Sequence, residues 1–274
     1  MSSKICLVTG ANGGIGRAVA TALAGRDATL VLACRDRERG QAARAEIIAA
    51  SGNQSVDVLQ VDLSEQRSVR AMAAAFAAQY EQLDVLIHVA AVYKPSREAT
   101  VDGLETMFAV NHLGPFLLTT LLLERLKAGV PSRVLVVTAP STSSLDFDDL
   151  QAEKHFNALD VFGASKMANL LFAYEMARRL EGTGVAVNAV HPGLVKSNLM
   201  QQAPFIIRFI SGLVSSAPEQ AGSALARLAL SDSYAGLSGR FFSGGKEIKS
   251  NAYSHDLQNQ ARLWDASLTL TDSR

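Results

Sequence analysis

Short apolar runs alternate along the chain with longer segments that mix apolar and polar residues. The runs are rich in Val, Ile and Leu, and they cover residues 5–9, 29–33, 56–61, 85–89, 134–137 and 185–190. The run at 134–137, Val-Leu-Val-Val, is continuous, as is typical of parallel strands that are covered on both faces. A helix-like segment follows each run, and this alternation predicts a doubly wound α/β fold with helices on both sides of a parallel sheet.

Two helices and two irregular segments complete the predicted architecture. Residues 37–50 are charged at first and apolar later, and residues 71–80 are rich in alanine, which favours helix. Residues 141–157 show no clear period, whereas residues 201–214 contain an apolar helix-like run. With no internal repeat or linker, we expect one domain over residues 1–274, in which a substrate lid covers about 198–217.

Composition narrows the class of partner. The 274 residues carry 26 basic and 26 acidic side chains, so no net field draws the protein to nucleic acid or to an anionic membrane. Cys6 and Cys34 lie in strand-like runs, where cysteine acts as a small hydrophobe, and we predict neither a disulfide nor a metal site. No secretory signal or integral membrane segment is evident, which predicts a cytoplasmic monomer or homo-oligomer that binds a small hydrophobic substrate.

A glycine-rich turn follows the first strand and opens a helix that we expect to begin near Arg17. Gly10 permits a tight turn, Gly14 lets the backbone approach a pyrophosphate, and Gly16 allows helix and strand to pack closely. The N–H groups of the helix N-terminus then face the phosphate charge. Glycines can also simply make a turn, but this position between strand and helix predicts a Rossmann dinucleotide site, formed by Gly10, Asn12, Gly13, Gly14, Ile15 and Gly16.

The end of the second strand predicts which dinucleotide binds. A carboxylate there would bond the ribose 2′-hydroxyl of NAD, whereas an arginine pairs with the 2′-phosphate of NADP. Arg35 is the first charged residue after the strand, and Arg17 could assist it. The alternative is that Arg35 and Arg37 are solvated loop charges beside Asp36. We therefore expect NADPH, with NADH as the less favoured cofactor.

Several further motifs, in the same order along the chain, resemble those of the short-chain dehydrogenase/reductase family. They cover residues 9–16, 61–63, 110–112, 165–166 and 192–193. The chain is more narrowly similar to the retinol-dehydrogenase-like branch, through residues 33–36, 111–119, 150–154, 165–169 and 237–242. The resemblance spans nearly the whole chain.

The resemblance implies a seven-stranded parallel Rossmann sheet and gives roles to residues outside the glycine-rich turn. It implies that Asp62 contacts the adenine amino group and that Lys166 bonds the nicotinamide ribose. It places Val195 and Ser197 at the nicotinamide carboxamide, and it adds Leu63, Ala90, Asn111, Pro192 and Gly193 to the cofactor site. The alternatives are that Pro192 and Gly193 only form a turn and that Asp62 only caps a helix.

The chain departs from the family at the catalytic positions. The family's tyrosine, which gives a proton to the substrate oxygen, is replaced by Phe162, four residues before Lys166. The family's serine, which polarises the same carbonyl, aligns with Ala139, although a shift in register would bring Thr138 or Ser141 there. A third departure covers residues 88–91, where the sequence His-Val-Ala-Ala replaces the usual Asn-Asn-Ala-Gly.

The size of these losses excludes ordinary chemistry of the family. A missing general acid costs about 10²- to 10⁴-fold in rate, and a missing oxyanion donor about 10²- to 10³-fold. The two losses are not simply multiplied, because the groups act as a unit. From a typical turnover of about 10 per second, reduction of a conventional carbonyl would fall to about 10⁻³ per second or below.

Three hypotheses follow. The first is an atypical NADPH-dependent ketoreductase whose catalytic residues are Asn111 and Lys166; Asn111 could also be only a structural hydrogen bond. The proton would come from the substrate, for example from a phenol beside the carbonyl of an aromatic polyketide-like ketone, from water held by Asn111 and Lys166, or from another side chain. The second is a cofactor-binding protein without turnover. The third is a membrane-associated retinoid enzyme, in which the apolar residues 205–214 touch lipid rather than cover a substrate.

Overall fold

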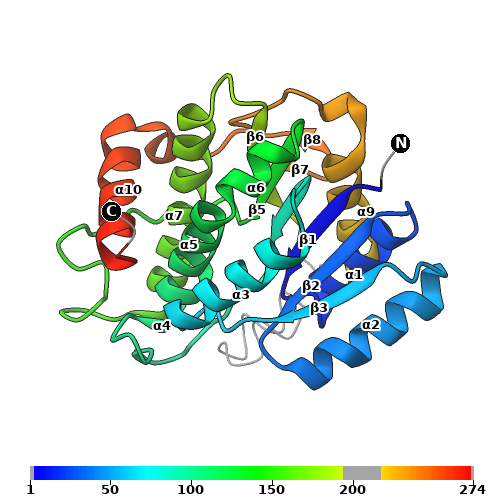
Figure 1. Ribbon diagram of the computed structural model, residues 1–274. Coiled ribbons are helices and arrows are strands. Elements are labelled where there is room, and N and C mark those ends of the chain that lie inside the picture. The colour runs from blue at the N-terminus through cyan, green and yellow to red at the C-terminus, as the bar shows by residue number, and fades with distance from the viewer. Residues whose placement is uncertain (1–2, 194–216, 273–274) are drawn as a thin grey trace.

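The computed structural model of the protein describes residues 3–193 and 217–272. Its sheet has the strand order β3-β2-β1-β4-β5-β6-β7-β8 (Figure 1). The strands are β1 (Ile5–Thr9), β2 (Thr29–Cys34), β3 (Val56–Gln60), β4 (Val85–His88), β5 (Ser132–Val137), β6 (Val185–His191), β7 (Phe241–Ser243) and β8 (Lys246–Glu247). The first seven pair in parallel, which confirms the expected parallel sheet.

The sheet has an eighth strand that the sequence analysis did not predict. β8 pairs with β7 in antiparallel register, Phe242 with Glu247 and Ser243 with Lys246. Gly244 and Gly245 join the two strands with φ angles of 58° and 86°. Two consecutive positive φ angles give a tight hairpin whose twist matches the strands, and glycine adopts them without strain.

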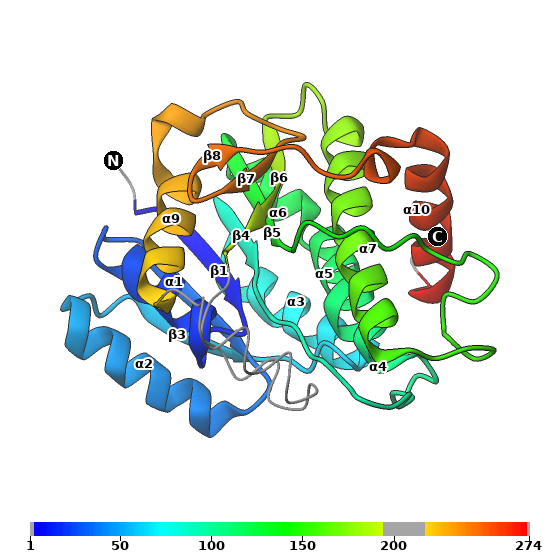
Figure 2. The same cartoon turned by 180° about the vertical axis from the view of Figure 1, so that it is seen from behind.

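Helices cover both faces of the sheet (Figures 1 and 2). On one face α1 (Gly14–Ala24), α2 (Arg37–Ser51) and α9 (Pro218–Leu230) share an apolar core with the strands. On the other face the core includes α3 (Gln66–Gln79), α5 (Gly114–Leu121), α6 (Leu123–Ala128), α7 (Ala158–Arg179) and α10 (Leu257–Leu270). Three short elements, α4 (Thr106–Phe108), a 3₁₀ turn η3 (Asp232–Tyr234) and a 3₁₀ turn η4 (Ala252–His255), lie in connections.

Close helix packing depends on one glycine in particular. A Cβ atom at Gly222 of α9 would lie 2.6 Å from the backbone of Ala18 in α1, so only glycine permits this crossing. The strands themselves alternate between the two cores: Cys6 and Val8 of β1 face α1 and α9, whereas Leu7 faces the α7 side. Cys6 and Cys34 are buried free thiols, in agreement with the expectation that they act as small hydrophobes.

The predicted element boundaries agree with the structure to within a few residues. β5 begins two residues earlier than expected, and the alanine-rich helix predicted at 71–80 is the second half of α3. Helix α1 begins at Gly14 rather than near Arg17. Residues 141–157 contain no helix or strand, as expected. The helix-like run at 201–214 lies outside the described residues.

The strand order indicates that the candidate site lies at the carboxyl ends of the strands. The chain passes from β1 outward to β2 and β3 and then returns to β4, on the other side of β1. Ligands of doubly wound folds bind at the carboxyl ends of the strands, at such a reversal of strand order.

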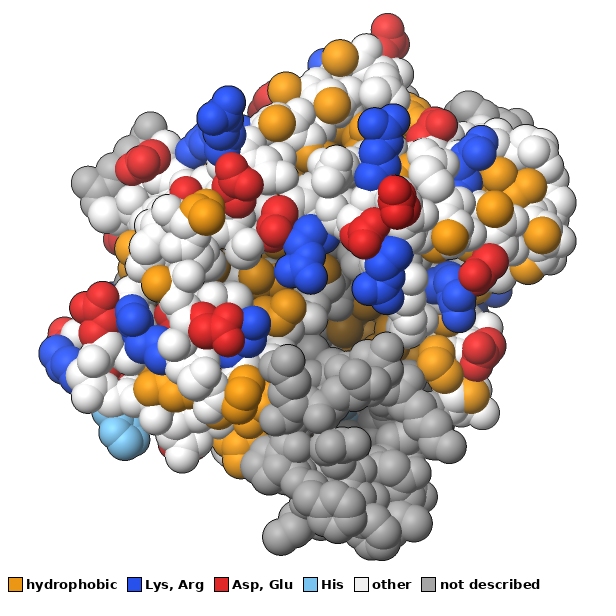
Figure 3. Space-filling model, turned by 90° about the horizontal axis from the view of Figure 1, so that it is seen from below, with side chains coloured by type: hydrophobic (Ala, Val, Ile, Leu, Met, Phe, Trp, Pro, Cys, Tyr) orange, Lys and Arg blue, Asp and Glu red, His pale blue; other side chains and the backbone are white. Residues whose placement is uncertain are grey.

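The described surface seen in Figure 3 carries interspersed acidic and basic side chains, and neither basic nor acidic side chains form a large patch there.

Candidate active site

The glycine-rich turn packs against its neighbours so closely that side chains would clash. Gly10 has a φ of 67°, and a Cβ on it would lie 3.0 Å from Cα of Ala90, in the loop after β4. A Cβ on Gly16 would lie only 2.2 Å from the carbonyl oxygen of Gly10. The Gly10 N–H donates to Ala33 at 2.9 Å, which ties the turn to β2. These contacts explain why the turn needs glycine at both positions.

The first turn of α1 offers space and donors to an anion. Gly13, the N-cap, is extended, and a Cβ built on it meets no described atom within 4 Å. No side chain of the described residues caps this helix, so the N–H groups of its first turn have no side-chain partner there. This arrangement fits the pyrophosphate of a dinucleotide, because the N–H groups and the helix dipole both favour negative charge.

Thr9 and His88 hold the loop after β4 beside this turn. The Thr9 hydroxyl oxygen accepts hydrogen bonds from the N–H groups of Val89 at 3.0 Å and Ala90 at 3.2 Å. His88 Nε2 lies 2.7 Å from the Thr119 hydroxyl, which itself donates to the Pro115 carbonyl. Nε2 therefore donates, and burial lowers the pKa of His88 to about 3. His88 thus takes a structural role between β4 and α5.

Two arginines without a described partner, Arg35 and Arg37, follow β2. Arg35 is exposed and its guanidinium has no described partner, whereas Asp36 caps α2 by accepting from Arg39 N–H at 3.0 Å. The Asp36 carboxylate is thereby committed to the helix. Arg17, which we expected to assist Arg35, instead forms an ion pair with Glu46 of α2. The structure therefore leaves Arg35 without its expected helper.

Asp62 and Leu63 lie at the end of β3, where the adenine contact was expected. The Asp62 carboxylate accepts from the Ser64 N–H at 2.9 Å and the Ser64 hydroxyl at 2.6 Å. The N-cap of α3 is Glu65, so Asp62 is not itself the helix cap. Gly114 packs against Leu63, since a Cβ there would lie 2.7 Å from the Leu63 carbonyl.

Asn111 lies in a π-helical turn, η1 (Ala109–Leu113), at the start of α5. Such turns are rare and often mark functional sites. The Asn111 amide accepts from Val92 N–H at 2.8 Å and donates to the Val92 carbonyl and to the Ser165 hydroxyl, both at 3.0 Å. Both donors of the amide and one lone pair of its oxygen are engaged, and the relay from Asn111 to Lys166 stays a prediction.

Lys166 faces an aromatic ring instead of a phenol. Its Nζ lies 5.1 Å from the centroid of Phe162, and the side chain is 7% exposed. Among the described residues no acceptor binds this ammonium, and burial lowers its pKa to about 8. An amine held in this way is available to the hydroxyl groups of a ribose.

The two hydroxyls that could replace the missing serine are already engaged. Thr138 donates to the Lys166 carbonyl at 2.7 Å, and Ser141 donates to the Gly163 carbonyl at 2.8 Å. Both therefore brace α7 rather than offer a proton to a substrate. Ala139, half-buried between them, has no polar side-chain atom.

Two hydroxyl residues near Phe162 were not singled out from the sequence. Tyr93 packs on the Phe162 ring, with centroids 5.7 Å apart, and Ser143 lies so close to Gly163 that a Cβ there would be 2.3 Å from its hydroxyl. Tyr93 follows β4 at the carboxyl edge, which is the signal that could have identified it. Ser143 carries no such signal, because its segment has no regular structure.

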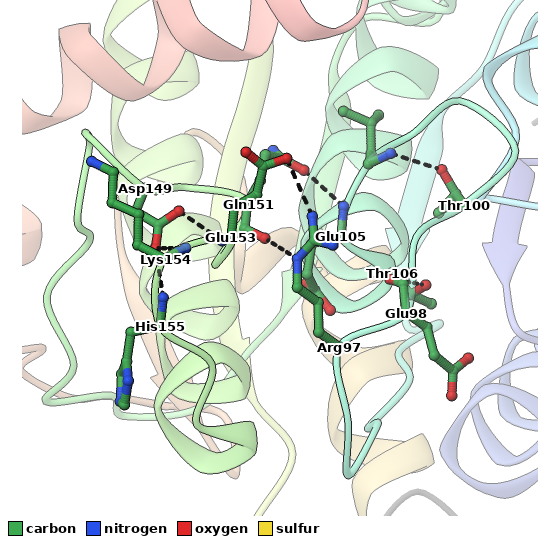
Figure 4. A network of polar contacts seen from close by, with 11 residues as sticks. Arg97, Glu98, Thr100, Glu105, Thr106, Asp149, Gln151, Glu153, Lys154 and His155 are labelled. Atoms are coloured by element: carbon green, nitrogen blue, oxygen red, sulfur yellow. Dashed lines mark hydrogen bonds and ion pairs between the residues drawn. The ribbon is translucent and has the colours of Figure 1, made fainter.

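A polar network fixes two loops at this edge (Figure 4). The Arg97 guanidinium donates to the Gln151 carbonyl at 2.9 Å, and the Gln151 side-chain oxygen accepts from Glu105 N–H at 2.7 Å. The buried Glu105 carboxylate caps α4, although burial raises its pKa. Asp149 holds the turn by accepting from the backbone N–H groups of Glu153, Lys154 and His155.

The last predicted cofactor residues follow β6. Gly193 has a φ of 82°, which favours glycine, and Pro192 precedes it. Val195, Ser197 and the predicted lid up to residue 216 lie outside the described residues. Their roles stay predictions.

The fold and this edge define the class of protein. The model of the short chain dehydrogenase family matches residues 4–204, and the chain belongs to this family. Human retinol dehydrogenase 12 is 41% identical over 100% of this chain and 88% of its own, and human retinol dehydrogenase 11 is 42% identical over 98% and 86%. These relatives support the retinol-dehydrogenase-like branch.

Solved structures agree with the fold. The crystal structure of an uncharacterised protein from Mycobacterium paratuberculosis superimposes with a TM-score of 0.80 at 29% identity, and covers 99% of this chain and 94% of its own. The Pseudomonas aeruginosa RhlG/NADP complex has a TM-score of 0.73 at 21% identity, with coverage of 93% and 97%. No helix in the described part of the chain is long and apolar enough to cross a membrane.

Proposed function

We propose that the protein is an NADPH-dependent oxidoreductase that reduces a hydrophobic carbonyl without the serine and tyrosine of its family. The observation that carries the proposal is a lysine whose ammonium faces Phe162 and has no described acceptor, in a chain whose glycine-rich turn leaves open space at the N-terminus of α1. Burial of a cation without a partner is costly, so a buried lysine that has no partner among the described residues favours a bound group that accepts its hydrogen bonds.

The residues divide the binding work between them. The open backbone at Gly13 and the start of α1 receive the pyrophosphate, and Arg35 receives the 2′-phosphate. Lys166 bonds the nicotinamide ribose, and the backbone after β4, held by Thr9, lies beside the glycine-rich turn. Bound NADPH supplies the hydride that the carbonyl carbon receives. The relatives' name supports a carbonyl–alcohol reaction, and a cytoplasmic location remains our prediction.

The proton must come from outside the usual pair. Thr138 and Ser141 donate to backbone carbonyls, and neither Phe162 nor Ala139 has a polar side-chain hydrogen. An acidic group on the substrate can replace them, as in an aryl ketone whose neighbouring phenol hydrogen-bonds the reacting carbonyl. Such a group acts at high effective concentration, and the protein then contributes mainly positioning.

The test uses matched ketones. We expect 1-acetyl-2-naphthol to be reduced by the purified protein with NADPH faster than its O-methyl ether, by about 10²-fold, because the ether has lost the internal acid. All-trans-retinal serves as the comparison that the relatives' name suggests. NADPH oxidation is followed by absorbance and the alcohols are identified by chromatography.

The other outcomes are informative. Equal rates on the naphthol and the ether would remove the internal acid from the proposal while leaving the reductase. Tight binding of NADPH without reduction of any of the three carbonyls would contradict the proposal and support a cofactor-binding protein without turnover.

A further inference from the structure

Tyr93 occupies an unusual position beside the replaced catalytic residue. Its side chain is 5% exposed, and its ring meets Phe162 edge to face, with an interplanar angle of 72°. Lys166 lies against the same Phe162 ring. One ring is therefore flanked by a phenol from the loop after β4 and an ammonium from α7.

The hydroxyl of Tyr93 lacks the hydrogen bond that every other tyrosine of the chain makes. Tyr80 bonds Asp57, Tyr174 bonds Ser250, Tyr234 bonds the Gly245 carbonyl and Tyr253 bonds the backbone of Leu145. For Tyr93 no partner exists among the described residues. The Tyr93 hydroxyl is not one of the fully enclosed polar atoms that lack a partner, so a bound ligand can reach it and accept its hydrogen bond.

The surroundings of Tyr93 indicate the class of that ligand. Tyr93 and the buried Met107 form an apolar cluster with the half-buried side chains Val92, Phe156, Ala158, Val161 and Phe162. A flat aromatic molecule packs well against such side chains, and its carbonyl oxygen would be the acceptor that the phenol lacks.

We propose that Tyr93 hydrogen-bonds the carbonyl oxygen of an aromatic substrate and donates the proton that Phe162 cannot give. The inference rests on the proposed reductase function and names its protein-borne acid. The carbonyl carbon accepts a hydride, which bound NADPH would supply, and forms a new C–H bond. As it does so, the C=O π electron pair moves to oxygen, the phenolic O–H bond breaks and a new O–H bond forms on the substrate. The Tyr93 phenolate then takes a proton from solvent. The Lys166 ammonium lies on the same Phe162 ring and supplies positive charge to this corner.

The decisive variant is Tyr93→Phe, which removes one oxygen and keeps the ring that packs on Phe162. On the O-methyl ketone, which has no acid of its own, we expect kcat to fall by about 10²-fold or more. On 1-acetyl-2-naphthol the fall should be much smaller, because the substrate carries its own proton. The Kd for NADPH should not change.

A second readout does not depend on turnover. The ¹³C-labelled O-methyl ketone is bound in the presence of NADP⁺, and its carbonyl stretch is recorded by infrared difference spectroscopy. A hydrogen bond from Tyr93 shifts this band to lower frequency in the wild type, and the shift should disappear in Tyr93→Phe. Tyr174→Phe, which removes the hydroxyl of another buried tyrosine, is the matched control and should keep both the shift and the rate.

Clear results would overturn the inference. The first is a Tyr93→Phe variant in which the shifted infrared band and kcat are both unchanged. The second is a Ser143→Ala variant that loses the band shift and the rate while Tyr93→Phe keeps them. If the wild type reduces none of the three carbonyls, the proposed function fails, yet the infrared band of the bound ketone still decides whether Tyr93 is the donor. Absence of any bound ketone band would also reject Tyr93 as its partner.

Discussion

Single side chains decide what this edge of the sheet can do. Phe162, which we predict to occupy the position of the family's proton donor, is a hydrocarbon ring that contacts both Lys166 and Tyr93. Arg35 and Asp36 illustrate a second local decision. Asp36 is next to Arg35, but its carboxylate caps α2, so the charge that faces outward from the end of β2 is the arginine.

Arg35→Ala should therefore weaken NADPH binding by about tenfold or more, since a charge-assisted hydrogen bond contributes about 1.5–3 kcal/mol. NADH binding should change little, because NADH has no 2′-phosphate. Isothermal titration of both cofactors gives the comparison. Arg37→Ala, which removes the neighbouring exposed arginine, is the control, and an equal effect of both variants on NADPH would show only a general loss of positive charge.

At the scale of elements, the site depends on segments that touch without side chains between them. Gly16 of α1 packs on the carbonyl of Gly10, and Gly10 packs on the loop after β4. The π-helical turn η1 holds Asn111 between Val92 and Ser165, and so joins the loop after β4 to α7. These contacts connect α1, the loop after β4 and α7.

Gly16→Ala and Gly13→Ala should separate packing from binding. The methyl group at Gly16 would overlap the Gly10 carbonyl, so we expect a loss of about 1–3 kcal/mol in the free energy of unfolding. The methyl group at Gly13 meets no described atom, so stability should be retained while the affinity for NADPH falls. Urea unfolding and cofactor titration measure the two effects. Retained affinity in Gly13→Ala would mean that the pyrophosphate does not approach this backbone.

At the scale of the whole molecule, two buried histidines join layers that lie far apart in the sequence. His88 links β4 to Thr119 of α5, and His112 of η1 bonds Ser267 of α10. Trp264 of α10 meets Phe116 edge to face and receives the Arg179 guanidinium on its ring. These contacts fix α10 over the helices that carry Asn111 and Lys166.

Burial lowers the pKa of both histidines to about 3, from an ordinary value of 6.5. Between about pH 6.5 and pH 3 these histidines are protonated in the unfolded chain but neutral in the folded protein. The free energy of unfolding therefore decreases as the pH is lowered through this range. The slope is up to about 1.4 kcal/mol per pH unit for each histidine. We expect urea unfolding to show this loss between pH 6.5 and 4.5.

His88→Gln should reduce the dependence of stability on pH, whatever it costs at pH 7, because it removes one of the histidines whose pKa is lowered by burial. His112 and His191, whose pKa values are lowered for the same reason, remain. His155→Gln removes an exposed histidine and should leave the dependence unchanged. An identical slope in wild type and His88→Gln would show that other groups govern acid unfolding.

The sequence by itself determined the order of the first strands and helices and the glycine-rich turn between β1 and α1, and the replacement at position 162 stays a prediction. Apolar strand runs, helical periodicity and glycine spacing are local features, so they can be recognised in the sequence without knowing the fold. The hairpin strand β8 could not be predicted, because two residues show no periodicity.

Only the tertiary structure decided which polar side chains remain without a hydrogen-bond partner. Arg17 is held by Glu46, Asn111 by Val92 and Ser165, and Thr138 and Ser141 by α7, whereas Tyr93 has no described partner. Hydrogen bonds between segments that are distant in sequence depend on which segments become neighbours in the folded protein, and no local sequence pattern specifies this.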